Sequence, residues 1–205
     1  LSWSLNRADH GEQPYWMAVT LAAMSGSMGK PGGGFGAGYA AMHSLGQPAS
    51  VQAAGLPVPA NPVKTFIPVA RISDLLLYPG QTIDYNGQKL TYPHIRLVYW
   101  CGGNPFHHHQ DLNRLLRAWQ KPETIIVHEP WWNSLARHAD IVLPCTTPLE
   151  RNDIVSGLFD NMILASRQVV APFGQARNDY DIFAALAERL GFRDAFTEDR
   201  TEMEW

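Results

Sequence analysis

Cysteines, charged residues and long apolar runs are all scarce in this 205-residue chain, and each scarcity excludes a class of protein. The two cysteines, Cys101 and Cys145, are too few for a disulfide framework or a four-thiolate zinc site. A net charge of -3 argues against nucleic acid or an anionic membrane as the main partner. No apolar run is long enough to span a bilayer. A hydrophobic content of 45% instead indicates a globular protein with a substantial core.

Tryptophan, in contrast, is abundant, and seven of them suit a protein that lines a deep pocket with aromatic walls. The chain starts at Leu1, and its first residues already resemble the middle of a motif. It stops at Trp205 within a charged segment. We therefore expect this sequence to be an internal section of a larger protein.

The first third of the chain predicts one helix followed by an irregular stretch. Asp9 and Glu12 are spaced as in a capping box, and the residues after them favour a helix over 15–28. A glycine-rich turn follows, and residues 44–64 are rich in proline, alanine, glycine and serine. That stretch could be a packed loop or a free linker. We expect residues 1–65 to form this helical and irregular segment, belonging to a neighbouring domain.

From residue 66 onward, strand patterns alternate with helix patterns, which is typical of an α/β domain with a mainly parallel, Rossmann-like sheet flanked by helices. We expect residues 66–205 to form such a dinucleotide-binding domain, incomplete here. The expected elements are a helix at 66–78, a hairpin around Asn86-Gly87, strands at 95–100, 124–128 and 141–143, helices at 110–120, near 132–138 and at 179–190, and an extended segment at 161–170.

The most informative stretch is residues 99–111, where two glycines and Asn104 stand between a strand and a helix. Glycines let backbone amides approach a ligand, and a helix N-terminus favours negative charge. The next strand ends in Glu129, which can accept hydrogen bonds from ribose hydroxyls or a guanine edge. The incomplete G-x-G-x-x-G pattern argues against an ordinary nicotinamide or flavin site. We predict a phosphate or nucleoside here; a turn that binds nothing and a solvated Glu129 are the alternatives.

His107, His108 and His109 suggest a metal, but adjacent histidines in a helix point in different directions. The chain offers them no well-spaced carboxylate or thiolate. We expect one of them to touch the ligand and the others to pack against the helix start, and we predict no metal ligand.

Further polar side chains follow the later strands. Arg151 is a candidate phosphate fork, with a surface salt bridge to Glu150 or Asp153 as the competing interpretation. Asn178 and Asp181 stand at the start of the last helix, where they could reach a base, although capping is the default expectation.

Together these residues resemble the dimethyl sulfoxide reductase family of molybdenum enzymes, most of all the branch of trimethylamine N-oxide, dimethyl sulfoxide and biotin sulfoxide reductases. The resemblance runs through almost the whole chain in one order and matches an internal section of such an enzyme. Its motifs are residues 3–7 with 10–13, 31–36, 102–105 with 108–111, 139–144, 150–153 and 178–183.

The resemblance implies two molybdopterin guanine dinucleotides on one molybdenum and oxygen-atom transfer from an S-oxide or N-oxide. It implies that Trp3, Ser4 and Arg7 contact this cofactor, and that Trp3 and Arg7 also line the substrate pocket, where they could polarise the departing oxygen. His128 fits the family pattern least well. The residues expected to hold the guanosine and phosphates of one dinucleotide are Asn104, His108, His128, Glu129, Arg151 and Asp181.

The family's serine ligand to molybdenum and its remaining pterin-binding segments have no counterpart here, so this section alone should be inactive. Its implied partners are the other domains of the same enzyme, a small S-oxide or N-oxide substrate and a cytochrome as electron donor in anaerobic respiration, with no nucleic acid and no membrane insertion. A bacterial periplasm is slightly favoured over the cytoplasm. The alternatives are an isolated nucleotide-binding module and a dinucleotide-dependent dehydrogenase without molybdenum.

Overall fold

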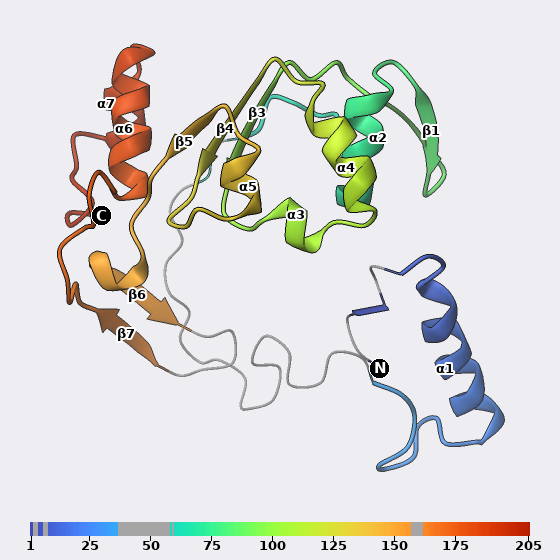
Figure 1. The fold of residues 1–205 in the computed structure, drawn as a ribbon. Coiled ribbons are helices and arrows are strands. Elements are labelled where there is room, and N and C mark those ends of the chain that lie inside the picture. The colour runs from blue at the N-terminus through green and yellow to red at the C-terminus, as the bar shows by residue number, and fades with distance from the viewer. Residues whose placement is uncertain (2–3, 6–7, 37–57, 59, 157–161) are drawn as a thin grey trace. The chain divides into compact units, whose positions relative to one another are not determined.

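A computed structural model describes residues 1, 4–5, 8–36, 58, 60–156 and 162–205. The chain divides into two compact units, one formed by residues 1–57 and 154–164 and the other by residues 58–153 and 165–205 (Figure 1). The predicted domain division at residue 65 stays a prediction.

The first unit contains helix α1, Glu12–Met24. The predicted capping box is wrong, because the N-cap is Gly11 and no side chain caps the helix. The helix also ends before the predicted residue 28. The hydroxyls of Ser25 and Ser27 each donate to the carbonyl of Ala22 at 3.1 Å, and such side-chain bonds compete with the continuing helix.

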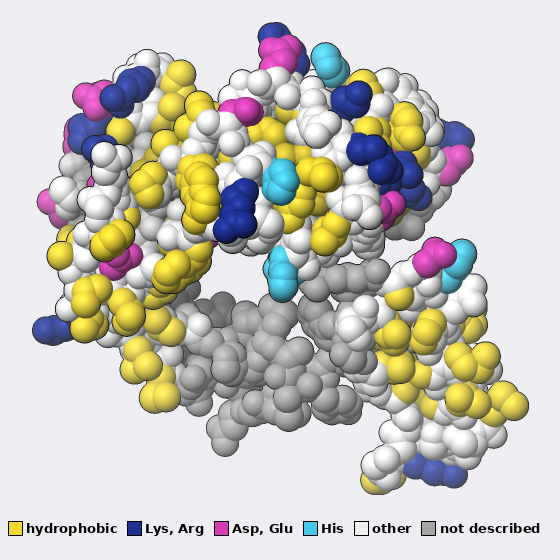
Figure 2. All heavy atoms as spheres, in the orientation of Figure 1, with side chains coloured by type: hydrophobic (Ala, Val, Ile, Leu, Met, Phe, Trp, Pro, Cys, Tyr) yellow, Lys and Arg dark blue, Asp and Glu magenta, His cyan; other side chains and the backbone are white. Residues whose placement is uncertain are grey.

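Large apolar side chains stand at the surface of α1 (Figure 2). Trp16 is 77% exposed and Met24 is 80% exposed, whereas Ala22 is the residue of this helix that is buried. The helix therefore has little core of its own.

The second unit contains a three-stranded parallel sheet in the order β3-β4-β5. Its strands are Leu97–Cys101, Thr124–His128 and Ile141–Leu143. The register pairs Cys101 with His128 and His128 with Leu143, so the three carboxyl ends lie at one edge. The α/β class and the parallel sheet are confirmed, and two of the three strands have the predicted bounds.

One face of this sheet forms the core. Side chains alternate along a strand, so Val98 and Trp100 of β3 point to the same side as Val127 of β4. Three helices cover this side (Figure 1). They are α2, Ile72–Leu77, α4, Leu112–Trp119, and α5, Ser134–Arg137, and their buried members are Leu76, Leu115, Ala118, Trp119 and Leu135.

Helix α6, Asp179–Arg189, packs on the opposite face, where the ring of Phe183 stacks on Tyr99 with centroids 5.9 Å apart. The short helix α7, Arg193–Thr197, packs against α6 and was not predicted. No helix among the described residues is long and apolar enough to cross a bilayer.

The helix predicted at 110–120 is α4, which begins at Leu112. A short helix that was not predicted, α3, Pro105–His108, precedes it and is separated from it by Asp111, whose φ of 44° is left-handed. The carboxylate of Asp111 accepts a hydrogen bond from the backbone N–H of Arg114 at 3.0 Å and so caps α4. This cap explains why the helix begins at Leu112 and not at the predicted residue 110.

The remaining elements are short. Strands β1, Thr82–Tyr85, and β2, Gln88–Thr91, form the predicted hairpin, with positive φ at Asn86 and Gly87 as that turn requires. Elsewhere β6, Asp153–Ser156, pairs with β7, Ile163–Ser166, and β6 was not predicted. The second unit also contains the 3₁₀ turns η3, Val69–Arg71, and η4, Pro148–Glu150.

Candidate nucleotide-binding site at the carboxyl edge of the sheet

The glycine turn after β3 is open and has a fixed conformation. Gly102 and Gly103 have φ values of 75° and 70°, which strongly favour glycine. A Cβ atom added to either would meet nothing within 4 Å. The indole Nε1 of Trp100 donates to the carbonyl of Gly102 at 2.8 Å and so holds the turn. A ligand can therefore approach this backbone closely.

Asn104 fixes the other side of the turn. Its Oδ1 accepts from the backbone N–H of Phe106 at 3.0 Å, which caps α3. Its Nδ2 donates to the hydroxyl of Ser134 at 3.1 Å, at the start of α5. Both ends of this amide are thus bonded within the protein, and its predicted contact with a ligand stays a prediction.

The three histidines after the turn differ in exposure. His107 and His108 are exposed, while His109 is half-buried and burial lowers its pKa. In the part of the chain that the structure describes, no three histidine, cysteine, aspartate or glutamate side chains group as metal ligands.

Glu129 lies where β4 and β5 both end. Its backbone N–H donates to the carbonyl of Leu143 at 3.3 Å, and its Oε1 accepts from the N–H of Trp131 at 3.2 Å. The residue is half-buried at this edge. This is the position at which α/β sheets bind ligands.

His128, one residue earlier, is instead part of the protein interior, with a side chain that is 1% exposed. Its Nδ1 lies 2.6 Å from Oδ1 of Asp179, and its Nε2 lies 2.7 Å from the hydroxyl of Tyr99. Both ring nitrogens are therefore taken by the protein. The predicted cofactor contact at this position stays a prediction, and the geometry leaves only backbone atoms for it.

Negative charge collects at this edge. Burial, followed by the charges of Asp179 and Glu129, raises the pKa of Cys145 to about 11. Burial and the charge of Asp179 also raise the pKa of Cys101. Asp179 is bonded to His128, which pairs with the last residues of both outer strands, Cys101 and Leu143. Two carboxylates at one edge suit the N–H donors of a guanine base or ribose hydroxyls better than they suit phosphate.

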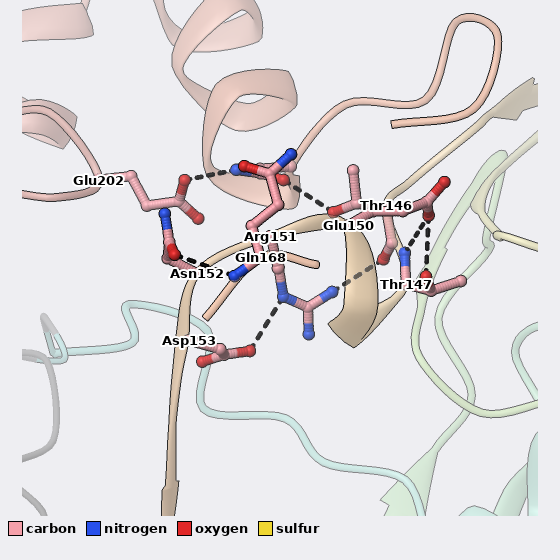
Figure 3. A network of polar contacts seen from close by, with 9 residues as sticks. Thr146, Thr147, Glu150, Arg151, Asn152, Asp153, Gln168 and Glu202 are labelled. Carbon is pink, nitrogen blue, oxygen red and sulfur yellow. Dashed lines mark hydrogen bonds and ion pairs between the residues drawn. The ribbon is translucent and has the colours of Figure 1, made fainter. Parts of the chain in front are cut away.

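Arg151 supplies a positive charge just after η4, in the loop that follows β5 (Figure 3). Its Nε donates to Oδ2 of Asp153 at 2.9 Å, and its Nη1 donates to the carbonyl of Thr146 at 2.8 Å. The salt bridge considered from the sequence is thus present, with Asp153 as the partner. Nη2 makes no hydrogen bond to any residue that the structure describes, so one nitrogen of the guanidinium is left for a phosphate oxygen.

Glu150 has a different role from the one considered from the sequence. Its carboxylate is buried and accepts from the N–H and hydroxyl of Thr147, at 2.8 and 2.9 Å, and from the N–H of Phe173 at 2.7 Å (Figure 3). These bonds hold the pKa of Glu150 below its ordinary value. The residue shapes the loop that carries Arg151.

The start of α6 connects to the same loop. Asn178 was expected to cap the helix, and this is wrong, since its side chain makes no cap bond. Its Oδ1 accepts from the hydroxyl of Thr146 at 2.7 Å, and its Nδ2 donates to Glu202. Asp181 is exposed in the first turn of α6. Thr146 thus links the Arg151 loop to the helix that presents Asp181.

The structure brings the glycine turn, Glu129, Arg151 and the start of α6 to the carboxyl side of one sheet. Trp3 and Arg7 lie outside the described residues, and Ser4 is exposed in the other compact unit. The residue that sequence reasoning missed is Asp179. A carboxylate in a first helical turn was its only signal, and its partner lies 51 residues away.

A family profile described as Molybdopterin oxidoreductase matches residues 1–189. The chain belongs to this family. The biotin sulfoxide reductase of Cereibacter sphaeroides is 53% identical over 206 residues, covering 100% of this chain and 28% of the relative. The dimethyl sulfoxide/trimethylamine N-oxide reductase of the same organism is 52% identical, covering 99% of this chain and 26% of the relative. The chain thus spans about a quarter of the length of these relatives.

Membership of the molybdopterin oxidoreductase family confirms the resemblance seen in the sequence and implies a molybdenum–molybdopterin cofactor. Among solved structures, acetylene hydratase from Pelobacter acetylenicus aligns with 51% of this chain and 14% of its own, at 24% identity and a TM-score of 0.45. This similarity is too low to add to the assignment.

Proposed function

We propose that this chain is a section of a molybdenum-dependent oxidoreductase that removes an oxygen atom from an S-oxide or N-oxide. Its part in that enzyme is to hold the guanine dinucleotide arm of one of two molybdopterins, while Trp3 and Arg7 line the substrate pocket. The observation that carries the proposal is 53% identity along the entire chain to a biotin sulfoxide reductase. The 52% identical relative named for two further oxides supports the same substrate class.

The described residues fit such a dinucleotide. The open backbone of Gly102 and Gly103 admits a pyrophosphate, and the remaining nitrogen of Arg151 can meet one of its oxygens. Glu129 and Asp181 offer carboxylates to guanine and ribose donors. When bound, the molybdenum cofactor supplies the two-electron redox chemistry, and the chain supplies binding, orientation and electrostatics.

The full-length protein, produced in a bacterium that makes the cofactor, tests the proposal as a whole. Metal analysis should find molybdenum, and acid hydrolysis should release GMP from the dinucleotide. A reduced viologen dye should be oxidised on addition of biotin sulfoxide, dimethyl sulfoxide or trimethylamine N-oxide. Protein that contains neither molybdenum nor tungsten would overturn the proposal.

Arg151→Ala and Asp181→Ala test the site itself. Each removes a charge-assisted contact, so each should lower the GMP bound per folded protein by roughly tenfold. Asp153→Ala is the matched control for the first, because it breaks the same surface ion pair and keeps the guanidinium. Glu188→Ala, exposed at the other end of α6, is the control for the second. GMP content that follows only the folded fraction in all four variants would contradict direct contact.

A further inference from the structure

His128 joins three elements of the fold at the candidate site. Its hydrogen bonds reach Tyr99 in β3 and Asp179, the first residue of α6. The imidazole also packs between aromatic rings, with centroid distances of 5.4 Å to Tyr99 and 4.8 Å to Phe183. A polar side chain this buried, with both nitrogens bonded, specifies one arrangement of its neighbours.

The chemistry of the three groups fixes the direction of each bond in the neutral ring. A carboxylate can only accept, so Nδ1 of His128 carries the proton and donates to Asp179. Nε2 is then the acceptor, and the hydroxyl of Tyr99 donates to it. The bond to Asp179 is the charge-assisted one and hence the stronger of the two.

Asp179, unlike His128, is exposed, at 49% of its side chain. Its bond to His128, the last residue of the central strand β4, places its charge between the two outer strands. Burial, and after it this charge, raises the pKa of Cys101 at the end of β3 and of Cys145 just after β5. Asp181 follows two residues later on the same helical turn. The position of Asp179 therefore determines where Asp181 lies.

We propose that His128 is a positioning residue, whose bond to Asp179 holds the first turn of α6 against the carboxyl ends of β3 and β4 and so sets where Asp181 meets the ligand. The effect on the ligand rests on the proposed function, whereas the effect on α6 does not. The hydroxyl of Tyr99 completes the network at Nε2, but its bond is to His128 and not to α6.

Two substitutions separate the two bonds of the ring. Asparagine places an amide N–H near the position of Nδ1, so His128→Asn can keep the bond to Asp179 and loses the one to Tyr99. Glutamine reaches the position of Nε2, so His128→Gln can keep the bond to Tyr99 and loses the one to Asp179. Each variant loses one hydrogen bond and part of the ring packing. Tyr99→Phe and Asp179→Ala remove the same two bonds from the partner side.

Alkylation of Cys145 reports the position of α6 without any cofactor. This thiol is 8% exposed and is covered by the segment that leads into α6, where the N–H of Thr146 donates to the carbonyl of Arg177 at 3.0 Å. The full-length protein, prepared without molybdenum, is treated with iodoacetamide, and the peptide that contains Cys145 is quantified by mass spectrometry.

We expect His128→Gln to raise the alkylation rate of Cys145 by roughly tenfold, which corresponds to the loss of one charge-assisted bond worth about 1.4 kcal/mol. Asp179→Ala should raise the rate further, because it also removes a charge that raises the pKa of this thiol. His128→Asn and Tyr99→Phe should stay within about twofold of the wild type. In protein loaded with molybdenum, GMP content should fall in the first pair and be kept in the second.

If His128 only stabilised the fold and did not position α6, a different result would be expected. In that case the Asn and Gln variants lose thermal stability, Cys145 protection and GMP together, and this parallel loss would overturn the inference. Equal protection of Cys145 in all four variants would overturn it as well. If the alkylation pattern appears as expected but the wild type contains no GMP, the proposed function fails and the positioning of α6 stands.

Discussion

The two faces of the parallel sheet are held in different ways. The face under α2, α4 and α5 is covered by apolar packing, and Val127 at its centre is fully buried. The face under α6 keeps a groove of about 790 Å³. Sheet residues Tyr99, Ile126, Ile141 and Leu143 line this groove together with Ile182 and Leu186 of α6. Ile141 is still 44% exposed there.

On the α6 face, hydrogen bonds hold the covering elements to the sheet, as apolar contacts do on the other face. The bonds from His128 to Asp179, from Thr146 to Asn178 and from Phe173 to Glu150 fasten the loops and the helix to the sheet edge. Such bonds are directional and depend on pH, whereas apolar burial is neither directional nor dependent on pH. Packing on one face of the sheet therefore supplies most of the stability, and the other face carries the pH-sensitive polar site.

The largest expected effect is on the free energy of unfolding, and it distinguishes two neighbouring residues of β4. Ile125 is 4% exposed and belongs to the core, whereas Ile126 points to the groove and is half-buried. Ile125→Ala should cost about 2–5 kcal/mol through lost burial and an unfilled cavity. Ile126→Ala should cost roughly 1 kcal/mol, because the groove already leaves space beside it. Hydrogen exchange of the β4 amides in the full-length protein measures both.

Equal losses in the two variants would break the comparison, since they would mean that both faces are packed alike in solution. Leu115→Ala and Leu116→Ala on α4 provide a second such pair, at 0% and 36% exposure.

An effect of intermediate size is expected on the melting temperature, and it depends on the pH and on Glu150 on the α6 side. The carboxylate of Glu150 accepts three hydrogen bonds that lower its pKa, so its contribution is present above the ordinary glutamate pKa of about 4.3 and is lost as pH falls through the lower pKa of the folded state. Glu150→Gln should lower the melting temperature at pH 7, because its NH₂ group would face a donor. The difference between wild type and variant should shrink toward pH 3.

Glu188→Gln, on the exposed part of α6, is the control and should leave the melting temperature unchanged at both pH values. A difference for Glu150→Gln that stays constant from pH 7 to pH 3 would show that the carboxylate charge plays no part.

Sequence patterns predicted the apolar face well and the polar face poorly. Strands β4 and β5 have the bounds that their apolar runs predict, and α4 buries Leu115 and Trp119 as its helical spacing predicts. Local periodicity carries this information because packing on one face repeats along the chain.

Contacts on the α6 face join residues far apart in sequence, and no local pattern encodes them. Asn178 looks like a cap but bonds to Thr146, 32 residues away. For Arg151 the sequence left Glu150 and Asp153 open as salt-bridge partners, and only the geometry shows that the partner is Asp153. The glycine turn and Glu129 were found from the sequence because strand ends in α/β folds meet at one edge. Asp179 was missed because its role depends on a buried partner in another strand.

The smallest expected effect leaves stability unchanged and concerns only the reactivity of the cysteines at the ends of the two outer strands. Cys101 after β3 is exposed, whereas Cys145 after β5 is buried and its pKa is raised to about 11. A raised pKa means less thiolate at every pH below it, so at pH 8 Cys145 should carry roughly 100-fold less thiolate than an ordinary cysteine. In protein prepared without the cofactor, iodoacetamide should therefore modify Cys101 first. The alkylation rate of Cys145 should keep rising up to pH 10, where glutathione has already levelled off. If Cys145 instead levels off with glutathione, the segment leading into α6 does not cover it in solution, and the polar face is more open than the distances at its edge indicate.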